Sequence, residues 1–236
     1  MEMKASDRVI DAETTDPAWK TLYKIGGWAA ALMALIYPLQ IVVFTIAPPA
    51  DTAIGWFTLF QSNKLLGLLS FELLFVFYGV LSIPVTIALY VSLRRIEPSL
   101  TAIYLALGLV GTAMLFAARP AFEMLSLSNQ YAAATTEAQR SLYLAAGETI
   151  MTIFKGTAFQ VSYYLGSITG LIVSIVMLKS NLFSKATAYV RIASSVLDFG
   201  ILIPKIGIFI SIFSVLFLLV WNILISRRLF QLGRAS

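Results

Sequence analysis

The stretch TEAQRSLYLAAGETIMTIFKGTAFQVSYYLGSITGLIVSIVMLK, residues 136–179, joins a charged segment to an apolar segment of membrane-spanning length. Thr136 and Gln139 form the capping-box pattern, in which each side chain satisfies a backbone N–H at the start of a helix. Polar residues then recur at helical spacing as far as Lys155, which predicts an amphipathic helix. Residues 159–178 contain no charge for about 20 positions, enough to cross a hydrocarbon core of about 30 Å. The stretch therefore predicts one helix that starts amphipathic and continues as a membrane span.

A row of small residues follows one side of this apolar segment at i+4 spacing. The row consists of Ser162, Gly166, Gly170 and Ser174. Burying apolar surface gives helices in lipid no advantage in associating, so small residues that allow close backbone approach are typical of their contacts. Two interpretations remain open. The row is a helix-packing seam beneath a solvated charged end, or it lines a cavity that continues into the charged part.

The composition indicates an integral membrane protein. Of the 236 residues, 59% are hydrophobic and only 12% are charged, whereas soluble domains have about 25% charged residues. Cysteine and histidine are both absent from the sequence, which excludes disulfides, thiolate nucleophiles and imidazole ligands, so we expect no metal and no cofactor. The net charge of +5 comes from basic residues spread over loop ends. We therefore expect membrane lipids as partners and no nucleic acid.

The apolar runs predict an all-α polytopic bundle with six transmembrane helices in residues 17–236, after a polar tail at 1–16. The predicted spans are 25–46, 65–93, 100–118, 156–178, 186–203 and 206–226. Most lysines and arginines then lie in loops on the side of the termini, so the positive-inside rule places both termini in the cytoplasm of a multi-pass cell-membrane protein. We also expect an interfacial helix over 53–60, a short helix within 121–135, and Ser184 as the N-cap of the fifth span.

Two carboxylates lie inside predicted spans, both in the outer half of the membrane. A charge at the centre of a spanning helix costs about 2.5 to 3.5 kcal/mol on insertion scales, so it normally faces the bundle and finds a partner. Glu72 in the second span and Asp198 in the fifth are therefore the leading candidates for a ligand or ion pocket. We expect Arg191, by contrast, to snorkel to the cytoplasmic headgroups. Other candidates for the same pocket are Lys155, Glu148, Arg119, Lys205 and Tyr163.

These carboxylates allow two interpretations. In one, each is protonated or paired with a nearby Lys or Arg and only fixes helix register. In the other, a carboxylate in a water-accessible pocket exchanges protons or binds a cation or an amine.

The last third of the chain, residues 154–233, resembles an uncharacterised family of prokaryotic six-helix membrane proteins, domain of unknown function 4386. The resemblance rests on the order of the spans and on residues 201–204, Gly207, Trp221, Asn222, Arg228 and Leu229. It implies a prokaryotic origin and six spans. It implies no activity and no site residues.

No phosphate-binding glycine loop or nucleophile elbow is present, so we assign no catalytic residue. The leading hypothesis is a non-enzymatic accessory subunit or a bundle that binds a lipid or apolar ligand, in contact with other membrane subunits or a second copy. The alternative is a small transporter or ion-coupled permease that uses the buried carboxylates. An intramembrane enzyme has the least support, because it would need a carboxylate or tyrosine mechanism.

Overall fold

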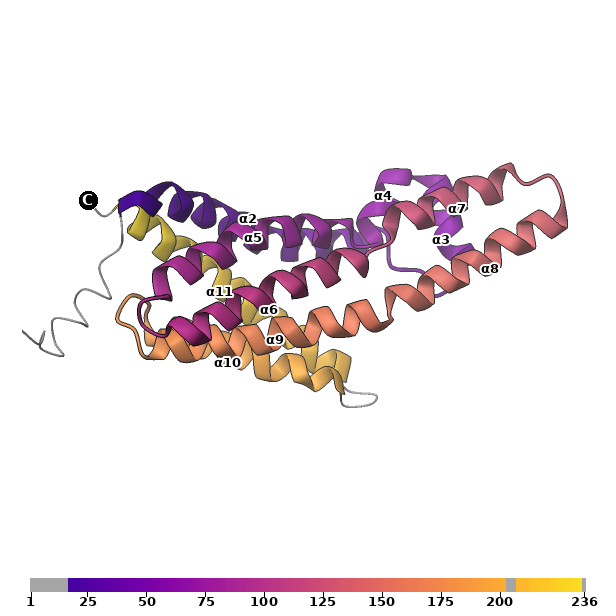
Figure 1. Ribbon diagram of the computed structural model, residues 1–236. Coiled ribbons are helices and arrows are strands. Elements are labelled where there is room, and N and C mark those ends of the chain that lie inside the picture. Colours follow the sequence, from indigo (N-terminus) through magenta and orange to yellow (C-terminus); the bar gives the residue numbers. More distant parts are fainter. Residues whose placement is uncertain (1–16, 203–206, 235–236) are drawn as a thin grey trace, which may run out of the picture. The chain divides into compact units, whose positions relative to one another are not determined.

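The computed structural model describes residues 17–202 and 207–234, and all regular structure in these ranges is helical (Figure 1). The all-α prediction is therefore confirmed. The predicted tail at 1–16 and the candidate residue Lys205 lie outside the described residues. The elements in chain order are η1 Pro17–Trp19, α2 Lys20–Ile46, α3 Ala53–Ser62, α4 Lys64–Ser70, α5 Leu73–Leu93, α6 Pro98–Ala117, α7 Ala121–Ala133, α8 Glu137–Phe154, α9 Thr157–Leu178, α10 Lys185–Asp198, η2 Phe199–Leu202 and α11 Gly207–Arg234.

Within the described ranges, five helical segments are long and apolar enough to cross a membrane. They are Lys20–Ile46, Leu73–Leu93, Pro98–Ala133, Glu137–Leu178 and Phe213–Arg234. Of the predicted fifth span, 186–203, the described residues 186–202 lie in the 14-residue helix α10 and in η2, and neither element is among these segments. The apolar helices indicate a membrane-embedded protein, while the count of six spans stays a prediction.

Local signals place several helix ends correctly, but two helices expected to be continuous are broken. Thr136 and Gln139 form the capping box of α8, and the Ser184 side chain accepts from the Thr187 N–H at the start of α10. The predicted second span is divided between α4 and α5 at Phe71 and Glu72. The helix predicted over 136–179 is divided between α8 and α9.

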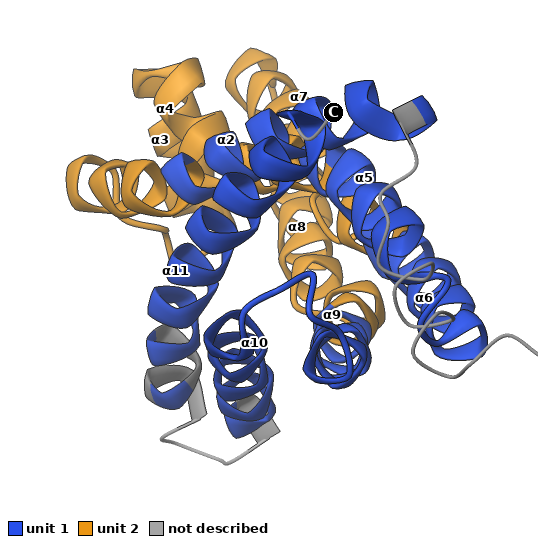
Figure 2. Ribbon diagram, turned by 90° about the vertical axis from the view of Figure 1, so that its left-hand side faces the viewer, with its two compact units in different colours: residues 1–35, 80–112, 163–236 blue, residues 36–79, 113–162 orange. Residues whose placement is uncertain are grey.

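The chain forms two compact units, shown in different colours in Figure 2. Unit 1 comprises Met1–Leu35, Val80–Thr112 and Tyr163–Ser236, and unit 2 comprises Ile36–Gly79 and Ala113–Ser162. The boundaries fall inside α2, α5, α6 and α9.

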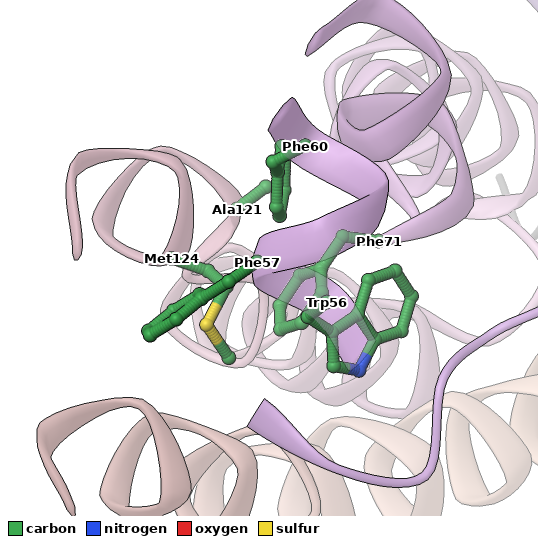
Figure 3. Packing of buried hydrophobic residues seen from close by; sticks show 6 residues of the cluster. All are labelled: Trp56, Phe57, Phe60, Phe71, Ala121 and Met124. Atoms are coloured by element: carbon green, nitrogen blue, oxygen red, sulfur yellow. The ribbon is translucent and has the colours of Figure 1, made fainter. Parts of the chain in front are cut away.

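An aromatic core organises unit 2 (Figure 3). Its buried members come from α3, the α4–α5 junction and α7, and they are Trp56, Phe57, Phe60, Phe71, Ala121 and Met124. The Trp56 and Phe71 rings meet edge to face with centroids 4.6 Å apart, the geometry that aromatic quadrupoles favour. The helices expected over 53–60 and within 121–135 both form, as α3 and α7. Their aromatic and apolar side chains face this core.

In unit 1, α2 packs closely against α11. The Ser226 hydroxyl donates to the Gly27 carbonyl at 2.8 Å, and the Trp28 and Phe230 rings meet edge to face. A Cβ on Gly26 would lie 3.0 Å from the Ala88 Cβ, so the glycine lets α2 approach α5 closely without a shift of the neighbouring side chains.

Candidate functional sites

Glu72 and Arg119 form a largely buried ion pair in unit 2. The Arg119 Nε lies 2.8 Å from the Glu72 Oε2, and the two side chains are 6% and 23% exposed respectively. The Nε–H bond is not directed at that oxygen, so the contact is an ion pair without an aligned hydrogen bond. Arg119 also donates from Nη1 to the Ala118 carbonyl at 3.2 Å. Of the partners that the sequence offered for Glu72, the structure selects Arg119.

The backbone of Glu72 is strained. Its φ is +61°, and it is the only residue other than glycine with a positive φ among those described. Long side chains rarely adopt this conformation, which costs about 1 to 3 kcal/mol and is concentrated at functional sites. The strain lies at the break between α4 and α5. The residue that interrupts the helix is therefore also the residue that carries the carboxylate.

Three phenylalanine rings surround the Arg119 guanidinium. Its Cζ lies 5.9 Å from the centroid of Phe75, 5.1 Å from that of Phe154 and 5.4 Å from that of Phe159. These distances are within the range in which a cation is attracted to a ring face. The rings and the Glu72 carboxylate together offset the cost of removing the guanidinium from water.

The same contacts bring three helix breaks together in unit 2. Arg119 lies between α6 and α7, Glu72 lies between α4 and α5, and Phe75 is the third residue of α5. Phe154 is the last residue of α8 and Phe159 the third of α9, so these two rings flank the third break. We call this set of five residues the Arg119 junction. The junction therefore places residues from all three helix breaks around one guanidinium.

Polar side chains bind the backbone next to this junction. The Gln40 Nε2 donates to the Leu69 carbonyl at 3.2 Å, and the Ser70 hydroxyl donates to the Ala47 carbonyl at 2.7 Å. Such partners are needed wherever a helix is interrupted away from water. The Gln40 Oε1 is buried and has no hydrogen-bond partner.

Asp198, the second leading candidate, lies in unit 1 at the end of α10 and is 7% exposed. The Tyr163 hydroxyl donates to its Oδ1 at 3.2 Å, and the Ser214 hydroxyl donates to the same oxygen. Its hydrogen-bond donors are thus hydroxyl groups of α9 and α11. Tyr163 and Asp198, both named from the sequence, are brought together by the fold.

Arg191 does not snorkel, and that expectation is wrong. The residue is 8% exposed, its Nη2 donates to the Gly166 carbonyl at 2.8 Å, and its Nη1 lies 3.3 Å from the Ser194 hydroxyl. The physical reason is the polar face of α10, which packs inward in unit 1. A stripe at helical spacing marks this face in the sequence and would have revealed it: Thr187, Arg191, Ser194, Ser195 and Asp198.

Two further predicted pocket residues, Glu148 and Lys155, form no ion pair or hydrogen bond with Glu72 or Asp198 in the described part of the chain. Glu148 accepts the Ala53 N–H at 2.9 Å, so it binds the first turn of α3, where a negative charge also meets the positive end of the helix dipole. Lys155 is exposed at the break between α8 and α9.

The small-residue seam is partly covered by the chain itself. A Cβ on Gly170 would lie 2.4 Å from the Ser195 Oγ and 2.5 Å from the Arg191 Nη2. Ser174 is fully buried and donates to the Gly170 carbonyl, while Ser162 donates to the Phe159 carbonyl. In unit 1 the space beside Gly170 is therefore filled by side chains of α10.

No protein-family model matches the chain, and no curated protein or solved structure shows significant similarity to it. The resemblance to the six-helix prokaryotic family stays a prediction. The two polar sites therefore rest on their geometry alone.

Proposed function

We propose that the chain is a six-span protein of the cell membrane that acts as a non-enzymatic, ion-coupled carrier of a small solute, with the Glu72 and Arg119 ion pair as its switch. The observation that carries the proposal is the coincidence of a buried ion pair, a strained backbone at Glu72 and three helix breaks in one junction.

Interrupted helices support this function. Many carriers bind solutes and coupling ions where spanning helices are broken, and ionisable residues inside the membrane mark such pathways. When Glu72 is ionised, its charge compensates Arg119. When Glu72 takes up a proton, the buried guanidinium loses its counter-charge and the junction must rearrange to compensate it. Proton uptake would in this way drive movement at the breaks.

The covered seam makes the accessory-subunit hypothesis less attractive. That hypothesis needed a free row of small residues for another polypeptide. At Gly170 and Ser174 the row is already in contact with the chain's own side chains or fully buried.

Measurements of transport currents on a solid-supported membrane test the carrier proposal. Proteoliposomes would be exposed to amino acids, sugars, organic acids and amines under a proton gradient. We expect a solute-dependent current in the unchanged protein and in Glu123→Gln, which replaces an exposed acid on α7 of the same unit. Glu72→Gln and Arg119→Gln should abolish it. A current that survives E72Q, or no current with any solute, would contradict the proposal.

A further inference from the structure

The start of α2 and the end of α11 pack side by side in unit 1 (Figure 1). A Cβ on Gly233 would lie 2.9 Å from the Lys24 Cγ and 3.3 Å from the Lys20 carbonyl oxygen. Further along both helices, the Trp28 and Phe230 rings have centroids 5.2 Å apart. Both helices belong to segments that are long and apolar enough to cross a membrane, so this contact lies at one end of two candidate spans.

Basic side chains follow both helices along the flank that the two rings mark. On α2 they lie four and eight residues before Trp28, and on α11 they lie three residues before and four residues after Phe230. Residues at these spacings share one face of a helix. We call these four bases the basic flank: Lys20, Lys24, Arg227 and Arg234. Lys20 is partly exposed and the other three are exposed.

The acids in the described part of unit 1 have partners of their own. They are Glu97 and Asp198. Glu97 accepts from the Lys179 Nζ at 2.6 Å, and Asp198 is buried, with the Tyr163 hydroxyl as one of its donors. The positive charge of the basic flank is therefore not balanced within the described part of unit 1.

An exposed apolar surface continues from the basic flank along α2. Trp28, Leu32 and Leu35 lie on one face at i, i+4 and i+7, and they are 65%, 47% and 62% exposed. Tryptophan is typical of the level at which a span meets the lipid headgroups. The order along this face is bases, then an aromatic ring, then aliphatic side chains. A phospholipid has the matching order of phosphate, glycerol and acyl chains.

We propose that the basic flank and Trp28 bind an anionic phospholipid, with its phosphate at Lys24 and Arg227 and its acyl chains along Leu32 and Leu35. Lysine and arginine form charge-assisted hydrogen bonds to phosphate, and clusters of them next to a span attract anionic lipids. Phosphatidylcholine should bind less well, because its quaternary amine cancels the charge of its phosphate. The surface is exposed, so no internal cavity is needed. The site is independent of the carrier proposal, because it requires only that α2 and α11 span the membrane.

Quenching of Trp28 fluorescence by brominated lipids tests the site. Phosphatidylcholine nanodiscs would contain a fixed fraction of dibrominated phosphatidylglycerol or of dibrominated phosphatidylcholine. The difference between the unchanged protein and Trp28→Phe isolates the Trp28 signal. We expect the phosphatidylglycerol probe to associate at least about fivefold more strongly, the factor that one basic residue gives near a lipid surface. Inorganic phosphate in solution should not displace it.

Two double variants with equal loss of charge separate this site from a general attraction of the surface. Lys24→Gln with Arg227→Gln should abolish the preference, whereas Lys24→Arg with Arg227→Lys should keep it. The control is Lys179→Gln with Lys185→Gln, which removes two exposed bases of unit 1 that lie outside the basic flank and already have hydrogen-bond partners. All four positions are partly or fully exposed, so folding should persist, and the unfolding temperature checks this. Equal loss of preference in both glutamine pairs, no preference in the unchanged protein, or displacement by inorganic phosphate would overturn the proposal.

Discussion

The Arg119 guanidinium is held 2.8 Å from the Glu72 carboxylate, and these two residues occupy two different helix breaks of unit 2. A double-mutant cycle measures their coupling. We expect Glu72→Gln or Arg119→Met alone to lower the free energy of unfolding by about 3 kcal/mol, because either leaves a buried charge uncompensated. The double variant should lose less than the sum of the two. Additive losses in unfolding from mixed micelles would show that the pair is not coupled.

The positive φ of Glu72 makes a separate prediction that does not involve its charge. Glu72→Gly and Glu72→Ala both remove the carboxylate, but only glycine adopts a φ of +61° without strain. We expect E72G to be more stable than E72A by about 1 kcal/mol. Equal stability of the two variants, measured in the same micelles, would show that the backbone is relaxed.

Glu148 is expected to stabilise the start of α3. Its Oε1 accepts the Ala53 N–H at 2.9 Å, so Glu148→Ala should cost about 1 kcal/mol, as the loss of other helix caps does. Hydrogen exchange at the Ala53 amide should accelerate. The control is Glu137→Ala, because the Glu137 side chain is 87% exposed and exposed ion pairs contribute little. If the two variants behave alike, Glu148 is not a cap.

Two glycines of the seam should respond oppositely to alanine. At Gly170 a Cβ would overlap Ser195 and Arg191, whereas at Gly166 it would meet nothing within 4 Å. We expect Gly170→Ala to cost about 1 to 3 kcal/mol through overpacking. Gly166→Ala should stabilise the helix by up to about 1 kcal/mol, because it restricts the unfolded chain. Thermal unfolding of the two variants tests this prediction. A stabilising effect of G170A would mean that α10 moves away from α9 at little cost in free energy.

Local patterns in the sequence were sufficient for the helical class of the fold and for two helix caps. The capping box at Thr136 and the N-cap at Ser184 depend on neighbouring residues only, so both could be predicted. The break at Glu72 could not, because the surrounding residues are apolar and of membrane length. The ion pair at this break joins Glu72 to Arg119, which lies far away in the sequence, so no local pattern records it.

The prediction for the polar face of α10 was wrong for a different reason. Arg191 lies near the start of a predicted span, and its position alone favoured snorkelling to the headgroups. Its neighbours at helical spacing are polar as well, so the face as a whole gains more from packing against α9 and α11 in unit 1. The burial of a residue in a spanning helix has to be predicted from all residues on the same face of that helix. The depth of a single residue in the span does not determine the direction of its side chain.

The most direct test of the switch is the distance between spin labels on α4 and α8, both in unit 2. The chain contains no cysteine, so Leu65→Cys and Leu142→Cys provide two exposed labelling sites on an otherwise unreactive protein. Electron–electron double resonance in nanodiscs would compare this pair alone, with Glu72→Gln, with Arg119→Gln and with Glu123→Gln. We expect E72Q and R119Q to shift the distance distribution in the same way, because both break one ion pair, and E123Q to leave it unchanged. Distributions that are identical in all four proteins would contradict the role of the Glu72 and Arg119 pair as a switch.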